Sequence, residues 1–209
     1  PMGGFQGDLA DVKAPALGTV AIEAALKRAG LTGDQVNEVI MGCVLPAGMG
    51  QAPARQASLG AGIPEAVGCT TINKMCGSGM KATMMAHDAI LAGSNSIAVA
   101  GGFESMTNAP YLLDRARGGY RMGHGQVYDH MFLDGLEDAY KPGRLMGTFA
   151  EETAQHYQFT REAQDEFAIT SLKRAKQAGE DGTADAEIVP VTVKGRKGDT
   201  VISRDEQPF

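Results

Sequence analysis

Cysteine, basic charge and long apolar runs are all scarce in this 209-residue sequence. The three cysteines form no CxxC pair and no Cys/His ladder, which excludes a disulfide framework and a zinc site. Lys and Arg number 19 against 25 Asp and Glu, and the net charge of −6 argues against a nucleic-acid or basic membrane-binding surface. No apolar run is long enough to span a bilayer, and no signal peptide is recognised. We therefore expect a soluble, cytoplasmic protein without metal, nucleic-acid or membrane partners.

Glycine, by contrast, is abundant. The chain has 28 glycines, nearly twice the average usage, and they follow no fixed period, which excludes collagen. They must therefore serve tight turns and close approaches between backbone segments. The length is sufficient for a buried core in one large domain or two small ones.

Helical and strand patterns alternate in the first half of the chain. Apolar spacing and flanking Gly and Pro predict helices over 15–29, 52–59 and 80–91, and strands over 38–44, 68–73 and 97–102. The strand–helix–strand run from 68 to 102 is typical of a βαβ unit, whose two strands are parallel. The fold class predicted is α/β.

The second half is less regular. Residues 105–147 are rich in glycine with little periodicity, and a loop of that length is usually functional or an interaction element. Thr148 to Glu151 has the pattern of a capping box that opens a helix, and Thr160 is predicted to cap a longer helix through Lys176. The segments 187–194 and 200–203 are predicted to form a hairpin around 195–199.

Cys76 is placed where a predicted strand ends and a helix begins, close to Gly77 and Gly79. The backbone N–H groups at a helix N-terminus favour a thiolate, and neighbouring glycines let a substrate approach, so a nucleophilic cysteine is one interpretation. A buried structural thiol is the other, and the local pattern does not decide between them. Cys43 and Cys69 lie within apolar strand patterns and are interpreted as structural.

A dinucleotide-binding motif and a catalytic base are two further questions at this turn. Residues 77–82 also fit G-x-G-x-x-A, with Glu104 after the next strand, as in a dinucleotide-binding fingerprint. That motif is short, and the spacing to Glu104 is longer than usual. A base for the thiol would have to come from the four histidines, which are His87, His124, His130 and His156, and nothing local assigns the role to any of them.

The segment Asn73–Ala82, NKMCGSGMKA, closely resembles the nucleophile motif of thiolases, the acetyl-CoA acetyltransferase family. Residues 101–110, 50–57 and 146–151 are similar to further segments of that family, in the same order. The resemblance extends over essentially the whole chain. It implies that Cys76 is the nucleophile that carries the acyl group as a thioester.

The resemblance also implies a reaction, substrates and an assembly. The reaction is a Claisen condensation of an acyl-CoA with acetyl-CoA, or the reverse thiolysis, with coenzyme A thioesters as substrates and no cofactor. Met146 matches a position that lines the acyl pocket. Residues 115–126 resemble the loop through which tetrameric members associate, or are a mobile surface loop, so a homodimer or homotetramer is expected. A β-ketoacyl synthase of the same fold is the alternative.

The chain departs from the family pattern in three respects. Leu145 stands where many biosynthetic members have a histidine before the Met-Gly pair, which leaves the acyl-chain preference open. The family's base histidine and second cysteine match no segment here, and its first core strand is also missing. We therefore expect an internal fragment that turns over little by itself. Its residues 1–104 would form a partial N-terminal core domain, and 105–209 a truncated, inserted loop domain.

Overall fold

The computed structural model describes residues 1–207. The chain divides into two compact units, one of residues 10–131 and one of residues 1–9 together with the segment from 132 onward. We describe each unit by itself. The predicted domain boundary between residues 104 and 105 stays a prediction.

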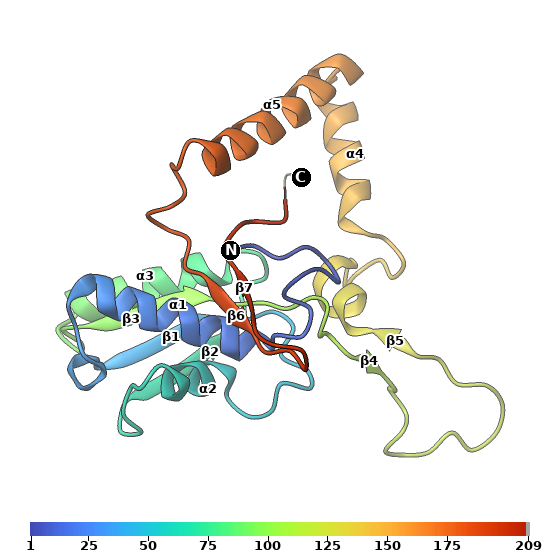
Figure 1. Cartoon of the computed structure of the whole chain (residues 1–209). Helices are drawn as coiled ribbons and strands as arrows, with labels where there is room; N and C mark the ends of the chain where they lie inside the picture. The colour runs from blue at the N-terminus through green and yellow to red at the C-terminus, as the bar shows by residue number, and fades with distance from the viewer. Residues whose placement is uncertain (208–209) are drawn as a thin grey trace. The chain divides into compact units, whose positions relative to one another are not determined.

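The unit of residues 10–131 is built around a parallel sheet. Its elements are α1 (Ala14–Ala29), the 3₁₀ turn η1 (Gly33–Gln35), β1 (Glu38–Gly42), α2 (Pro53–Gly60), β2 (Gly68–Ile72), α3 (Ser78–Leu91) and β3 (Ala98–Gly102), followed by the short strands β4 (Tyr111–Leu112) and β5 (Tyr128–Asp129) (Figure 1). Every predicted helix and strand of this region is present, with ends within two residues. The α/β class is confirmed.

The order of the strands in the sheet is β2-β1-β3. Val39 of β1 lies opposite Cys69 on one side and Val99 on the other, and both pairings are parallel. The predicted parallel direction of β2 and β3 is thus confirmed, but the two strands are not neighbours, because β1 lies between them. All three strands end at the same edge of the sheet.

Helices cover both faces of β1. Val39 and Met41 point into a core shared with α1 and α2, which supply Ile22 and Ala57 among others. Ile40 points to the opposite face, where α3 packs Ala82 and Ala86 against it. A central parallel strand must be apolar on both faces, and the run Val39–Ile40–Met41 satisfies this requirement.

The ends of α1 follow ordinary helix chemistry. Pro15 lies in the first turn, where its missing N–H costs no hydrogen bond. Gly30 follows the last turn with φ of 67°, and its N–H is donated to carbonyls of the final turn. The glycine therefore ends the helix as the sequence predicted.

The second unit holds α4 (Met146–His156), α5 (Arg161–Glu180) and the antiparallel hairpin of β6 (Val191–Val193) and β7 (Thr200–Ile202), with a π-helical segment, η2, over Phe132–Leu136. The predicted hairpin is confirmed. Thr160 caps α5, because its hydroxyl accepts the Ala163 N–H at 3.2 Å. The helix continues to Glu180, beyond the predicted end at Lys176.

The capping box predicted at Thr148 is wrong. The helix α4 already begins at Met146 after Leu145, so Thr148 lies within its first turn. Its hydroxyl donates to the Leu145 carbonyl at 2.8 Å instead of accepting a backbone N–H. The Thr-x-x-Glu spacing is present in the sequence. However, the residue with extended backbone directly before the helix, where a capping side chain would act, is Leu145 and not Thr148.

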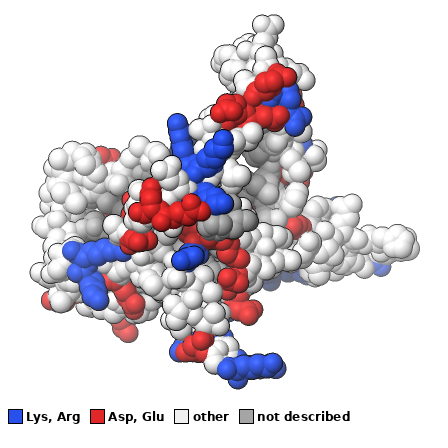
Figure 2. All heavy atoms as spheres, turned by 45° about the horizontal axis from the view of Figure 1, so that its top comes forward, with Lys and Arg blue, Asp and Glu red and all other residues white. Residues whose placement is uncertain are grey.

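The surface shown in Figure 2 carries acidic and basic side chains in small, interspersed groups. This distribution is unlike the single basic stripe of a nucleic-acid-binding face. Among residues 1–207, no helix is both long enough and apolar enough to cross a membrane.

Candidate active site at Cys76

Cys76 lies in the turn that connects β2 to α3. The strand ends at Ile72, the helix begins at Ser78, and Gly77 is the residue before the helix. The cysteine is exposed to solvent. The first turn of α3 contains no acidic side chain, so nothing there offsets the positive end of the helix dipole. An exposed thiol at such a position is suited to attack by its thiolate form.

The side chain of Ser78 holds this turn together from within. Its hydroxyl accepts the Lys74 N–H at 2.8 Å and donates to the Met75 carbonyl at 2.5 Å. Ser78 itself is buried, and both hydrogen bonds are part-buried. Together they close a loop around Cys76 and fix the backbone on both sides of it.

Met75, directly before the cysteine, has a left-handed backbone conformation with φ of 50°. Residues other than Gly adopt this conformation at a cost of about 1 kcal/mol or more, and it persists only where the surroundings impose it. Here the Asn73 side chain imposes it, because its Oδ1 accepts the Met75 N–H at 2.9 Å. Such strain is typical of functional turns.

Glycines let the start of α3 approach the sheet. A Cβ on Gly42, the last residue of β1, would lie 2.6 Å from the carbonyl carbon of Ser78, closer than atoms can approach. A Cβ on Gly102, the last residue of β3, would make only an ordinary contact of 3.5 Å with the Cα of Gly79, so Gly42 is the position where the approach requires glycine. The turn of Cys76 is therefore placed directly against the carboxyl edge of the sheet, as the glycine content suggested.

Comparison with known protein families shows which family the chain belongs to. The family model described as the thiolase N-terminal domain matches residues 1–209. The chain belongs to the thiolase N-terminal domain family. The resemblance of residues 73–82 to the thiolase nucleophile motif is thereby supported by the whole chain.

Curated relatives of this thiolase chain are similar along nearly all of it. The acetyl-CoA acetyltransferase of Cupriavidus necator is 52% identical over 206 residues, which cover 99% of this chain and 52% of the relative. Acetyl-CoA acetyltransferase 2 of Arabidopsis thaliana and the Escherichia coli acetyl-CoA acetyltransferase are each 51% identical over 208 residues, 99% of this chain and 51% and 52% of their own lengths. The chain thus spans about half the length of the curated relatives it matches.

The other two cysteines of the thiolase chain are in different environments. Cys43 follows β1 and is buried, with 2% of its surface exposed. Burial, reinforced by the neighbouring Glu104 carboxylate, raises the pKa of the Cys43 thiol from 9.0 to about 12. Cys69 is half-buried in β2, and its thiol points to the Val67 carbonyl at 3.5 Å. These surroundings agree with the structural roles expected for both.

Glu104, the acidic residue of the dinucleotide-binding alternative, is engaged by the protein itself. One carboxylate oxygen accepts the Val44 N–H at 2.7 Å, and the other accepts the Leu45 N–H at 3.0 Å. The Cys43 thiol donates to the same carboxylate at 3.4 Å. A carboxylate with these partners is not available to a ribose hydroxyl, so the dinucleotide interpretation loses its acidic residue.

The histidines of the first unit differ in exposure. His130 is buried, and its Nε2 accepts the Ala47 N–H at 3.4 Å, so this nitrogen has a structural partner. His87 is exposed on α3 and lies 3.3 Å from the Asp88 carboxylate. His124 is exposed in the glycine-rich segment. His156, in the second unit, stacks edge-on against Tyr157.

Within residues 1–207 no group of three or more His, Cys, Asp or Glu side chains forms a metal site.

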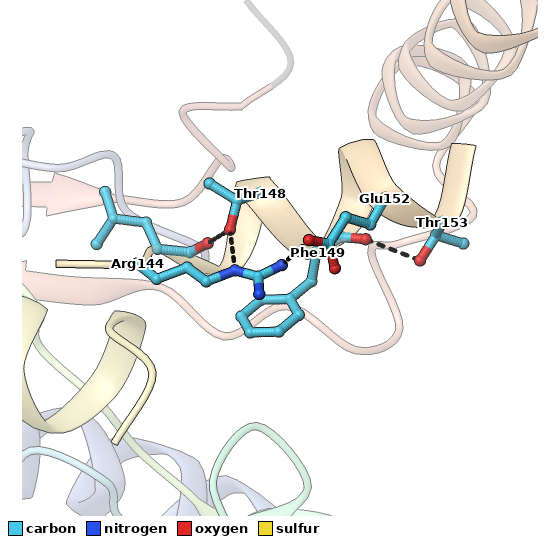
Figure 3. A network of polar contacts seen from close by, with 6 residues as sticks. Arg144, Thr148, Phe149, Glu152 and Thr153 are labelled. Atoms are coloured by element: carbon cyan, nitrogen blue, oxygen red, sulfur yellow. Dashed lines mark hydrogen bonds and ion pairs between the residues drawn. The ribbon is translucent and has the colours of Figure 1, made fainter. Parts of the chain in front are cut away.

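Met146, the residue expected in the acyl pocket, belongs to the second unit and is the first residue of α4. Its neighbour Arg144 organises the start of that helix (Figure 3). The guanidinium lies 3.9 Å from the centre of the Phe149 ring, its Nε donates to the Thr148 hydroxyl at 3.0 Å, and it forms an ion pair with Glu152. The hydrogen bond from Arg144 lowers the pKa of the Glu152 carboxyl.

The hydrogen bonds of Ser78 and the contacts of Arg144 were not predicted from the sequence. A serine two residues after a candidate nucleophile is able to bond back to the turn. The i, i+4 spacing of Arg144 and Thr148, with Glu152 four residues further, was the available signal for a helical network.

Proposed function

We propose that the protein carrying this chain is an acyl-CoA C-acyltransferase of the acetyl-CoA acetyltransferase type. The observation that carries the proposal is the exposed thiol of Cys76, held in a strained turn at the start of α3 within a chain of the thiolase family. Relatives named acetyl-CoA acetyltransferase are about half identical to it over its length.

In the first step the Cys76 thiolate attacks the carbonyl carbon of an acyl-CoA. A new sulfur–carbon bond forms, the bond between the carbonyl and the coenzyme A sulfur breaks, and coenzyme A leaves as a thiol after taking up a proton. In the second step the α-carbon of acetyl-CoA, having lost a proton to a base, attacks the acyl-cysteine and releases Cys76. The reverse sequence is thiolysis. Splitting the condensation in this way replaces one difficult step by two easier ones.

Each part of the site would contribute a physical effect to these two reaction steps. The start of α3 supplies a positive dipole end to the thiolate and to the oxyanion that develops on the carbonyl. The glycine backbone leaves room for the thioester. Met146 would contact the acyl chain, and Leu145 in place of a histidine would make that contact apolar.

The wider assignment is also a proposal. Residues 1–104 would form part of an N-terminal core domain, and residues 105–209 would contribute a truncated loop domain inserted into a layered α/β core. The substrates would be acetyl-CoA and a second acyl-CoA, without a further cofactor. The active form would be a dimer or tetramer in the cytoplasm. Residues 115–126 would be the loop through which a tetramer associates. The 209 residues by themselves are expected to show little turnover.

The test is to incubate the complete protein that carries this chain with acetyl-CoA and to map acetylation by peptide mass spectrometry. We expect one acetylated thiol, Cys76, and loss of the modification in the Cys76→Ser variant. The Cys69→Ser variant is the matched control and should be acetylated at Cys76 like the wild type. Acetylation elsewhere, with Cys76 unmodified, contradicts the proposal. Acylation from an acyl carrier protein but not from acyl-CoA would favour the β-ketoacyl synthase alternative.

A further inference from the structure

Glu104 connects the ends of β3 and β1 at the edge of the sheet where Cys76 lies. It follows β3 by two residues, and both of its carboxylate oxygens accept backbone N–H groups of the segment that follows β1. The side chain therefore fixes Val44 and Leu45 in place by two hydrogen bonds from neighbouring residues. Hydrogen bonds to a charged acceptor are about twice as strong as neutral ones.

The segment fixed by Glu104 in turn contacts the turn of Cys76. The Val44 carbonyl accepts from the side-chain Nδ2 of Asn73 at 3.5 Å, while the Oδ1 of the same side chain accepts the Met75 N–H at 2.9 Å. One side chain thus joins the segment that follows β1 to the residue beside the nucleophile. The chain of contacts runs from Glu104 through Val44 and Asn73 to Met75, whose φ of 50° requires external support.

We propose that Glu104 is a positioning residue for Cys76, acting through Val44 and Asn73 on the left-handed turn at Met75. The proposal rests on the proposed function, since it concerns the reactivity of the same thiol. Glu104 does not touch the substrate in this account. It holds the backbone that places the exposed thiol at the N-terminal end of α3.

The contacts require a carboxylate at this position. Two adjacent N–H groups each face a different oxygen, so the Glu104→Gln substitution places an amide NH₂ against one of these donors. The Glu104→Asp substitution keeps two acceptors on a shorter side chain. We expect the rate of Cys76 modification to fall in the order wild type, Asp, Gln.

The matched control is Glu38, at the other end of β1. Its carboxylate is also part-buried and also bonds an asparagine side chain, Asn95, whose Nδ2 lies at 2.6 Å. That contact is at the amino end of the strand, away from the edge where β1 joins the segment held by Glu104. The Glu38→Gln variant therefore removes the charge of a part-buried carboxylate, while its amide oxygen is still able to accept from Asn95, and it does not touch the proposed chain of contacts.

The experiment measures alkylation of individual thiols by iodoacetamide in the complete protein that carries this chain. Peptide mass spectrometry reports Cys76, with Cys69 as the internal reference. We expect the rate of Cys76 alkylation to fall by up to about tenfold in E104Q and in Asn73→Ala, because small displacements of a reacting group have large effects on rate. Cys69 in the same samples, and both thiols in E38Q, should keep the wild-type rate.

A second readout separates positioning from general destabilisation. With acetyl-CoA as substrate, E104Q should lower kcat by about 10–100-fold while KM stays within about threefold. Because Glu104 and Asn73 act in series, the double variant should be no slower than N73A alone, whereas independent effects would multiply. The E104D variant should have a higher kcat than E104Q, because it keeps the carboxylate. A role of Glu104 in packing alone, independent of charge, does not predict this order.

Two results overturn the proposal. One is a wild-type rate of Cys76 alkylation in folded E104Q and N73A, and the other is a loss of equal size in E38Q. Should E104Q not fold, N73A and E104D decide the matter by the same measurement. If the wild-type protein is not acylated by acetyl-CoA at all, the proposed function fails, and the alkylation comparison still tests the positioning of Cys76.

Discussion

Glu206 accepts a hydrogen bond from the backbone N–H of Asp8 at 3.0 Å, across 198 residues of sequence. Its other carboxylate oxygen accepts the Gly4 N–H at 2.5 Å, and its own backbone N–H donates to the Met2 carbonyl at 3.0 Å. A side chain at Gly7 would collide with the same carboxylate. One acidic residue thus holds the first turn of the chain.

The first prediction concerns this contact. Glu206→Ala leaves two backbone N–H groups without their acceptor, so the free energy of local opening of residues 1–9 should fall by about 1–3 kcal/mol. Hydrogen exchange of the amides in that segment measures the change. Glu180→Gln, which removes an exposed partner of Lys176 on α5, is the control and should alter opening by less than about 0.5 kcal/mol. Equal protection in Glu206→Ala and wild type would contradict the assigned role.

The second prediction tests the close approach of α3 to the sheet. Gly42→Ala would place a methyl group within the backbone of Ser78 and Gly79, so the free energy of unfolding should fall by about 1–3 kcal/mol or more. Thermal or urea unfolding measures it. The control is Gly68→Ala at the start of β2, where an added Cβ meets nothing within 4 Å and the change should stay within about 0.5 kcal/mol.

The third prediction concerns pH. Since the pKa of Cys43 is raised from 9.0 to about 12 in the folded protein, the folded state keeps the thiol proton at pH values where the unfolded chain has released it. The stability from this group is complete below pH 9.0 and is lost as the pH rises toward about 12. Urea unfolding at a series of alkaline pH values should show a decline that Cys43→Ala lacks. An identical slope in the variant would refute the assignment.

The fourth prediction concerns the start of α4. Arg144→Lys keeps the charge but loses the planar group over Phe149 and the hydrogen bond to Thr148, so the amides of α4 should exchange faster. Because the pKa of Glu152 is lowered, its ion pair stabilises the helix above pH 4.5, and this contribution is lost as the pH falls through the folded pKa. Arg161→Lys on the exposed Arg161–Asp165 pair should have little effect in the same measurement.

The fifth prediction concerns acyl-chain preference. If Met146 contacts the acyl group, Met146→Ala should make room for longer acyl chains. The ratio of kcat/KM for a longer acyl-CoA to kcat/KM for acetyl-CoA should then rise by up to about tenfold for each added methylene. Cys76 alkylation should be unchanged. Met122, which is 97% exposed, provides the control in Met122→Ala. An unchanged chain-length profile in Met146→Ala would remove Met146 from the pocket.

Sequence patterns were informative wherever local chemistry decides the structure. Gly30 ended α1 and Thr160 capped α5 because each acts on backbone groups a few residues away. The buried run of β1 was recognisable from consecutive apolar residues. The thiolase resemblance is confirmed by the family match, and the role of Cys76 within residues 73–82 stays a prediction.

Long-range contacts were the part that sequence could not supply. Nothing near residues 97–104 indicates that β3 pairs with β1 rather than with β2, because strand order depends on how helices cover both faces. The partners of Glu104 lie 59 and 60 residues away, so its carboxylate looked like a ligand-binding group. At Thr148 a valid local motif failed because the helix had already begun two residues earlier.

The glycines at the ends of β1 and β3 also bear on how this site can change. The surface beneath the first turn of α3 is formed there by main chain, at Gly42, Gly79 and Gly102. Main-chain atoms are common to all amino acids. At these glycine positions there is therefore no side chain whose length or charge a substitution could alter. A substitution at Gly42 adds a Cβ that meets Ser78 and Gly79, so this surface stays fixed across variants that still fold.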